Sequence, residues 1–286
     1  MDAQLEHANC LICGGSDTEV FIRGCGPRHI VRCRRDGLLY LNPRPAATEL
    51  RGFQTRYVRH DNLEFFDSFR KAVLAREANA IKRFKKSGDL LDVGCATGTL
   101  FASFVGCGWR LFGVETSPVG ARLARQRYGA DVFCGTLRDA AWPSGSFDVV
   151  CVLDTLYYIP DPRRDLIEIK RVLKQDGLLA VEIPGLRYRL LRDRGIVCWL
   201  LDRRWRRMSP DCGHLYYFSP RTLCLLLESI GFRLITMVPE QASLGRRGVL
   251  AGVNHLHFSL ARLLFAASGG RLSIAAKELY LAVKVA

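Results

Sequence analysis

The amino-acid sequence predicts an α/β protein whose parallel sheet is covered by helices on both faces, with a small cysteine-containing unit in front of it. Three observations support this fold class. Short apolar runs alternate with helical patterns from residue 89 onward, which is typical of βαβ units. A glycine-containing turn follows the run that ends near Asp92 and leads into a helix. Residues 1–45 differ from the rest because they hold four cysteines among short β-like runs.

The composition excludes a disordered chain and leaves several classes of partner open. Of the 286 residues, 49% are apolar and 24% are charged, as in a globular protein of one large domain plus a small accessory unit. A net charge of +14 is compatible with nucleic acid, an anionic membrane surface or an anionic small substrate. The number of cysteines, eleven, is odd, those after Cys33 are scattered, and the first residues lack the pattern of a signal peptide, so we expect a cytoplasmic protein.

The order of the elements divides the chain into three parts. Residues 1–45 form the cysteine-containing unit, 46–87 a helical linker or cap, and 88–286 the α/β domain. Apolar runs in that domain predict strands at 90–94, 110–115, 131–134, 147–154, 178–183, 232–238 and 278–285. Helical spacing predicts helices at 99–106, 118–128, 163–174 and 221–229, the last capped by Ser219. Two insertions, 186–217 and 245–276, interrupt the alternation.

The strongest functional signal is segment 90–100, which reads Leu-Leu-Asp-Val-Gly-Cys-Ala-Thr-Gly-Thr-Leu. Gly94 and Gly98 allow a ligand to approach the backbone closely at a helix N-terminus. The acid Glu115 ends the next strand, 21 residues after Gly94, where α/β nucleoside-binding folds hold ribose hydroxyls. A nicotinamide site is not indicated, because Ala and Thr replace the second and third glycines of its fingerprint.

Several segments resemble, in order and spacing, the class I S-adenosylmethionine (SAM)-dependent methyltransferases. They are Asp92–Gly98, Gly113–Ser117, Ser146–Val150, Leu153–Leu156 and Arg171–Leu179. The resemblance covers about residues 88–184 and implies a Rossmann-like fold with a mostly parallel, seven-stranded sheet and SAM as cofactor. The cofactor-binding residues that it implies are Asp92, Gly94, Cys95, Gly98, Glu115, Thr116, Leu137 and Asp154. Among these, Glu115 would bind the ribose, Thr116 and Leu137 would flank the adenine, and the glycines and Asp154 would lie near the methionine.

The candidate catalytic residues are His214 and Tyr158. Many relatives carry Glu-His after the fourth strand, where this sequence has Tyr157 and Tyr158, and a phenol is a poorer general base than an imidazole near neutral pH. Segment 213–219 resembles the Glu-His-x-x-Tyr-Phe-Ser segment of a subgroup that includes sugar methyltransferases, in which the His lies at the active site. His214 is therefore the first candidate for a base or substrate ligand and Tyr158 the second, with a structural histidine as the alternative.

The N-terminal cysteines predict a metal site of zinc-ribbon type. Cys10 and Cys13 form half of a zinc knuckle, and the other half reads Cys33-Arg-Arg-Asp36, with Asp36 at the position of the fourth thiolate. Segment 33–45 resembles the stretch that joins a small zinc unit to the methyltransferase domain in the same subgroup. We expect these four residues to bind a structural zinc, and the alternative is a degenerate knuckle that folds by packing alone.

The two insertions bear on partners. Segment 186–217 holds eight Arg and three Asp, which predicts either a lid that grips a phosphate-bearing acceptor or a solvated basic face. Segment 249–267 has an apolar stripe, preceded by two arginines, that suits an anionic membrane surface, the domain itself or a partner subunit. Its Asn, His and Arg residues argue against a membrane-spanning helix.

The sequence thus predicts a SAM-dependent methyltransferase that acts on oxygen or carbon of a small-molecule acceptor, sugar- or phosphate-bearing and anionic. An RNA methyltransferase, supported by the charge alone, is one alternative. A non-catalytic SAM-binding homologue, with the tyrosine pair and Asp36 as signs of drift, is another. The acceptor, the methylated atom and the oligomeric state stay open.

Overall fold

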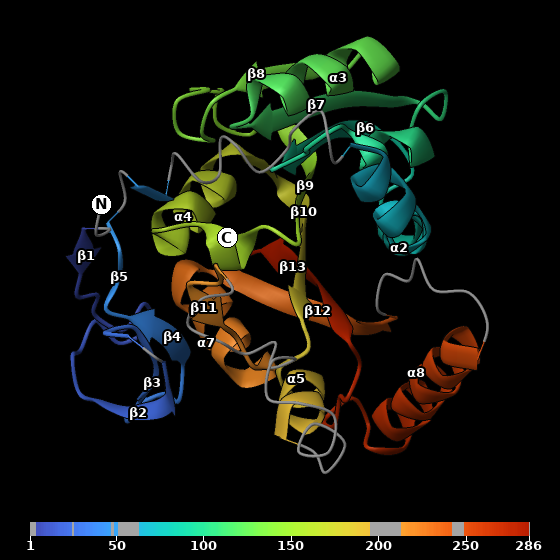
Figure 1. Ribbon diagram of the computed structural model, residues 1–286. Helices are drawn as coiled ribbons and strands as arrows, with labels where there is room; N and C mark the ends of the chain where they lie inside the picture. The colour runs from blue at the N-terminus through green and yellow to red at the C-terminus, as the bar shows by residue number, and fades with distance from the viewer. Residues whose placement is uncertain are drawn as a thin grey trace.

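The computed structural model describes residues 4–24, 26–46, 49–50, 63–194, 213–241 and 249–285. A seven-stranded sheet of order β12-β13-β10-β9-β6-β7-β8 forms the centre of these residues (Figure 1). The strands from β8 to β10 are parallel, whereas β13 runs antiparallel to both of its neighbours. The predicted α/β fold with a mostly parallel sheet is confirmed. The strands are β6 (Gly88–Val93), β7 (Trp109–Glu115), β8 (Asp131–Cys134), β9 (Phe147–Leu153), β10 (Leu173–Pro184), β12 (Phe232–Glu240) and β13 (Lys277–Lys284).

Both faces of the sheet are buried because alternate strand residues enter two separate cores. In β9, Val149 and Cys151 belong to one core, and Val150 and Val152 to the other. Helices from either side complete these cores, with α2 and α3 on one face and α4 and α7 on the other (Figure 1). The helices are α2 (Leu63–Phe84), α3 (Pro118–Tyr128), α4 (Pro162–Val172) and α7 (Pro220–Ile230). Ser219 caps α7 with Pro220 in the first turn, as predicted.

The N-terminal unit shares a sheet with the α/β domain. This sheet has the order β11-β4-β3-β2, and its strand β11 is contributed by residues that follow His214. Tyr216 of β11 pairs with Tyr40 of β4. The strands of the unit are β1 (Leu5–Glu6), β2 (Thr18–Arg23), β3 (His29–Cys33), β4 (Leu39–Asn42), β5 (Arg44–Pro45) and β11 (Tyr216–Tyr217). The segment around His214 is therefore held by the cysteine-containing unit.

Two elements differ from their predicted form. The helix expected over 99–106 is a short 3-10 helix, η2 (Thr99–Ser103), which Phe104 caps and which a run of turns follows, with Gly106 and Gly108 at positive φ. The helix expected to run to residue 174 ends at Val172, and the buried Leu173 already pairs with β9 as the first residue of β10.

The insertions contribute two further helices, α5 (Leu186–Arg194) and α8 (Val249–Ala267). Much of the predicted lid 186–217, and part of the predicted segment 46–87, lie outside the described residues. Among the helices that are described, none has the length and apolar character needed to cross a bilayer.

Candidate cofactor and active site

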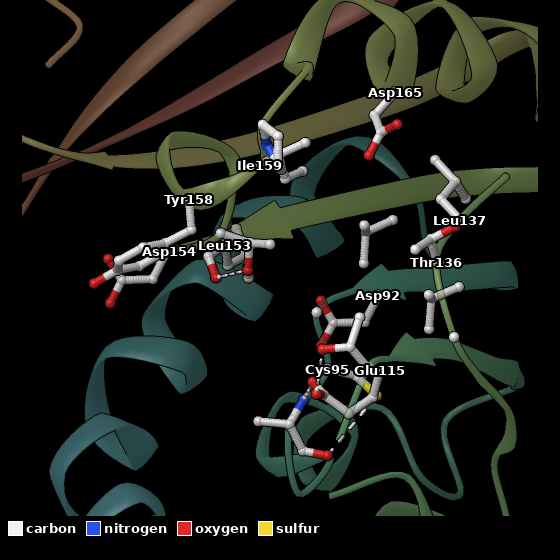
Figure 2. Close-up of a pocket in the computed structure, with 18 of the residues that line it drawn as sticks. Asp92, Cys95, Glu115, Thr136, Leu137, Leu153, Asp154, Tyr158, Ile159 and Asp165 are labelled. Carbon is white, nitrogen blue, oxygen red and sulfur yellow. Dashed lines mark hydrogen bonds between the residues drawn. The ribbon is translucent and has the colours of Figure 1, made fainter. Parts of the chain in front are cut away.

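A cavity of about 570 Å³ opens where strands β6, β7 and β9 end (Figure 2). Its volume falls within the usual range for small-molecule sites. Carboxyl ends of parallel strands meet at one edge, which brings together residues distant in sequence. Seven of the eight predicted cofactor residues line this cavity, namely Asp92, Gly94, Cys95, Glu115, Thr116, Leu137 and Asp154.

Glu115 is buried at the end of β7 with its carboxylate held by the backbone. One oxygen accepts a hydrogen bond from the N–H of Ser117 at 2.7 Å, and the other from the N–H of Ala96 at 2.9 Å. Each carboxylate oxygen can accept a second hydrogen bond, so the fixed group remains able to bind hydroxyls. Burial raises the pKa of Glu115, although these backbone hydrogen bonds act in the opposite direction.

Asp92 lies beside Glu115 and Cys95 at the ends of β6 and β7 (Figure 2). Burial raises the pKa of Asp92 to about 7, with Arg70 lowering it and Glu115 raising it further. Asp92 is therefore poised to change its charge near neutral pH.

Gly94 and Gly98, the two glycines of the turn, each lie against a different neighbour that leaves no room for a side chain. A Cβ on Gly94 would lie 2.6 Å from Oγ1 of Thr155, and φ is +79° there. A Cβ on Gly98 would lie 2.9 Å from Ala124, Phe101 and Tyr128. Gly98 does not line the cavity; its lack of a side chain lets the turn pack closely against α3.

Arg70 and Asp154 line the cavity beside the exit of β9 and belong to a buried charge cluster that also contains Glu182 and Lys277. The Lys277 ammonium lies 2.8 Å from Asp154 and 2.6 Å from Glu182, and the Arg70 guanidinium lies 2.8 Å from Glu182. Burial alone would raise the pKa of Asp154, but Lys277 and Arg70 hold it well below its usual range. Sequence reasoning missed Arg70 and Lys277; the only signal was a charged pair, Lys277 and Glu278, at the start of the final strand.

Glu77 of α2 lies next to this cluster and is fully buried. Neither of its carboxyl oxygens has a hydrogen-bond partner of ordinary geometry among the described residues. Burial, reinforced by the charge of Glu182, raises the pKa of Glu77 well above its usual range, so we assign it as neutral.

Tyr158 lines the cavity, and His214 lies behind it. Nε2 of His214 is 3.1 Å from the Tyr158 hydroxyl, and Nδ1 is 2.8 Å from the guanidinium of Arg189. Burial and the charge of Arg189 lower the pKa of His214 to about 3, so the ring is neutral. An Arg can only donate, so Nδ1 accepts, Nε2 carries the proton, and the ring donates to Tyr158. In this arrangement the imidazole orients the phenol and has no lone pair free to act as a base.

The N-terminal unit also reaches the cavity. Glu6 and Arg44 are among its lining residues, and Arg44 pairs with Glu6 at 2.9 Å. Arg44 further donates to the carbonyl oxygen of Pro160 at 2.9 Å and to the Tyr216 hydroxyl at 2.8 Å. Sequence reasoning assigned neither residue to the site, since nothing local to them indicated it.

Acids outnumber bases in the lining of the cavity. The lining bases are Arg44, Arg70, Arg138 and Arg164, and the lining acids are Glu6, Asp92, Glu115, Asp154, Asp161 and Asp165. Each of the four arginines forms an ion pair with a carboxylate. Among the described residues that line the cavity, there is therefore no unpaired cation of the kind that the net charge of the chain predicts.

The four predicted metal ligands come together in the N-terminal unit. The ligand atoms of Cys10, Cys13, Cys33 and Asp36 lie within 4.8 Å of one another. Asp36 is 3.1 Å from the sulfur of Cys10 and 3.3 Å from that of Cys33, and the sulfurs of Cys13 and Cys33 are 3.6 Å apart. Zinc–sulfur bonds of about 2.3 Å in a tetrahedron separate the ligand atoms by nearly this much. The donor set therefore fits a closed, structural zinc site.

Comparisons with known proteins identify relatives of the α/β domain. A family model described as a methyltransferase domain matches residues 66–237. A ubiquinone biosynthesis O-methyltransferase from Xanthomonas oryzae is 31% identical over 96 residues, which are 32% of this chain and 40% of that protein. A nocamycin O-methyltransferase from Saccharothrix syringae is 32% identical over 105 residues, 34% of this chain and 38% of that protein. These matches thus span about two fifths of each relative.

Solved structures share the fold across most of the chain. A SAM-dependent methyltransferase from Thermotoga maritima has a TM-score of 0.54 and 22% identity, covering 82% of this chain and 99% of that one. A chain of the complex between the Haloferax volcanii Trm112 methyltransferase activator and a methyltransferase has a TM-score of 0.57 and 16% identity, covering 83% and 98%. The family match covers more than half of the sequence, and the fold agrees with it; the chain belongs to the methyltransferase-domain family.

Proposed function

We propose that this chain transfers a methyl group from SAM to a hydroxyl group of a small-molecule acceptor. The observation that carries the proposal is Glu115, a buried carboxylate fixed by two backbone N–H groups on the wall of a cavity of suitable size. SAM, when bound, supplies a methyl group made electrophilic by its sulfonium charge. The excess of acids over arginines in the lining suits a cofactor of net positive charge.

The lining residues have separate tasks in this proposal. Glu115 accepts hydrogen bonds from the ribose hydroxyls, while Thr116 and Leu137 flank the adenine. Gly94 and Asp154 lie at the methionine end, where Lys277 keeps Asp154 ionised. Together they place the cofactor so that the acceptor can approach in line and water is excluded.

Calorimetric titration with S-adenosylhomocysteine tests the cofactor site. We expect Glu115→Gln to bind at least about tenfold more weakly, because a charged acceptor of hydroxyl hydrogen bonds is lost. Asp131→Asn, at an exposed position on the neighbouring strand β8, is the matched control and is expected to bind normally. The absence of binding in folded wild-type protein, or equal affinity in both variants, would contradict the proposal.

Tyr158 is the residue that we place against the acceptor, with His214 as its positioning residue. The names of relatives that are O-methyltransferases support a hydroxyl acceptor. Because the lining arginines are already paired, a neutral polyol or phenol suits the cavity better than a phosphate-bearing molecule. The imidazole N–H donated to the Tyr158 oxygen stabilises negative charge there, so that Tyr158, after losing its own proton to solvent, can take the acceptor's proton as the phenolate.

A screen of sugars and phenols with methyl-labelled SAM tests this assignment. For any acceptor that turns over, Tyr158→Phe and His214→Gln should each lower kcat while leaving the affinity for S-adenosylhomocysteine unchanged. The double variant should be no slower than the slower single variant, because the two side chains act as one unit. Additive losses would separate their roles, and cofactor binding without transfer to any acceptor would favour the non-catalytic alternative.

We further propose that Cys10, Cys13, Cys33 and Asp36 hold a structural zinc. It would join the turn around Cys10 and Cys13 to the β3–β4 turn with Cys33 and Asp36, next to β4, the strand on which β11 and the segment around His214 rest. Elemental analysis of the purified protein should find one zinc per chain, and Cys13→Ser should lower both the zinc content and the melting temperature. Wild-type protein that is stable and contains no zinc would contradict this proposal and would show that the unit folds by packing alone.

A further inference from the structure

Helix α8 presents an apolar stripe to solvent. Leu256, Leu260 and Leu263 have exposed fractions of 72%, 49% and 67%, and their spacing of four and three residues places them on one side of the helix. Three large apolar side chains exposed side by side are unusual for a monomer and indicate a surface that binds something.

The opposite side of α8 is the one that holds it to the protein. Ala261 is fully buried, and Phe265 packs against the main core. The ring of His257 lies 4.9 Å from the ring of Tyr188, which belongs to α5. The helix is thus fixed with its leucine stripe outward, at the periphery of the protein beside α5 (Figure 1).

The surroundings of the stripe are uniformly basic. Residues 241–276 contain four Arg and no Asp or Glu. Arg262 is exposed on α8 at the flank of the leucine stripe, and Arg271 follows the end of the helix. Arg187 of α5 donates a hydrogen bond to the backbone oxygen of Arg271 at 3.4 Å, which brings a further positive charge to the same rim.

The combination of an exposed leucine stripe with nearby arginines distinguishes between the kinds of partner that could bind this surface. A second copy of the chain would set the same arginines against each other with no acid in the insertion to pair them. RNA would satisfy the arginines and leave the leucines in water. An anionic lipid surface complements both, because acyl chains bury the stripe while headgroups meet the arginines.

We propose that α8 docks this protein onto the surface of an anionic lipid bilayer, with the helix lying in the interface plane. The docking does not depend on the proposed methyl transfer.

The topology places this surface at the edge of the sheet that bears the cavity. Helix α5 follows the carboxyl end of β10, and α8 lies between the end of β12 and the start of β13, at the same edge. Tyr188 contacts α8, and its neighbour Arg189 contacts His214. Docking through α8 therefore brings the edge with the active site toward the lipid.

Vesicle flotation with the full-length protein tests the proposal. Wild-type protein should float with vesicles of phosphatidylcholine and phosphatidylglycerol, should bind phosphatidylcholine alone much more weakly, and should be released by salt. Leu256→Glu/Leu263→Glu should lower partitioning roughly tenfold for each leucine. Arg262→Glu/Arg271→Glu should weaken binding to anionic vesicles and flatten its salt dependence. Ile167→Glu, at an apolar position on α4 that is 52% exposed, is the matched control and should float like wild type.

Three results would overturn the proposal. Wild-type protein that stays in solution with anionic vesicles is one, and a loss with Ile167→Glu as large as with the double leucine variant is another. The third is a wild-type dimer that Leu256→Glu/Leu263→Glu converts to a monomer, since the stripe would then bind a second copy. Melting temperatures of all variants show that they are folded, and S-adenosylhomocysteine binding, measured alongside, reports separately on the cofactor site.

Discussion

Replacing Lys277 by Met removes one of two cations from the buried charge cluster beneath the cavity. The ammonium lies 2.8 Å from Asp154 and 2.6 Å from Glu182, so it compensates two carboxylates at once. With Lys277 absent, only Arg70 faces both of them, 3.6 Å from Asp154 and 2.8 Å from Glu182. The variant therefore leaves two carboxylates to share one cation, and the side chain of one of them, Glu182, is fully buried.

The size of the loss follows from the cost of an uncompensated buried charge. Removing one partner of a buried ion pair lowers the free energy of unfolding by about 3–5 kcal/mol. Lys277 serves two carboxylates, so we expect about 4 kcal/mol or more at neutral pH. The loss should shrink in acid, because the pKa of Asp154 rises once Lys277 no longer lowers it, and the protonated acid needs no cation.

Urea unfolding followed by circular dichroism measures this loss. Arg164→Met is the control, because Arg164 is 71% exposed in its 3.2 Å pair with Asp161 and should contribute less than about 1 kcal/mol. Adding Glu182→Gln to Lys277→Met should restore part of the stability. The reasoning fails if Lys277→Met destabilises the protein no more than Arg164→Met does.

Two further predictions concern the turn that begins at Asp92. The pKa of Asp92 is raised from 3.8 to about 7, so the stability that its neutral form provides is lost as pH rises through about 7. Asp92→Asn should therefore match wild type near pH 4 and be more stable, by up to about 4 kcal/mol, near pH 8 in urea titrations; a constant difference would contradict this. Gly94→Ala should lower the melting temperature more than Gly129→Ala, because both positions have positive φ but only Gly94 faces Thr155 at 2.6 Å, whereas nothing lies within 4 Å of a Cβ on Gly129. Equal shifts in melting temperature would contradict this prediction, because they would show that the close contact with Thr155 adds no cost to the substitution of Gly94.

The parts of the fold that follow local rules were predictable from sequence. The run 147–154 is apolar at nearly every position, which is how a strand buried on both faces differs from an amphipathic one. The acids at the ends of β6 and β7 were predictable as cavity residues, since carboxyl ends of parallel strands converge. Capping by Ser219 likewise depends only on neighbours in the chain.

The features that depend on distant partners were not predictable. Arg70 and Lys277 both contact Glu182 although about two hundred residues separate them in the sequence, and neither belongs to a motif. The state of His214 depends on Arg189 and on burial, so the sequence could place this residue in the site and could not tell which ring nitrogen carries the proton. The length of η2 was overestimated, because the helical spacing of the sequence does not show that the backbone leaves the helix after Ser103 for a run of turns.

The pairing of β11 with β4 has a consequence for the order in which the chain becomes native during synthesis. Strands β2 to β4 leave the ribosome early, but the strand that completes their sheet lies about 175 residues further on. At ordinary elongation rates this interval is roughly 10 to 35 seconds, during which β4 presents an unpaired edge. The cysteine-containing unit is thus completed only after most of the α/β domain has been synthesised, and until then its exposed edge is open to mispairing or to a chaperone.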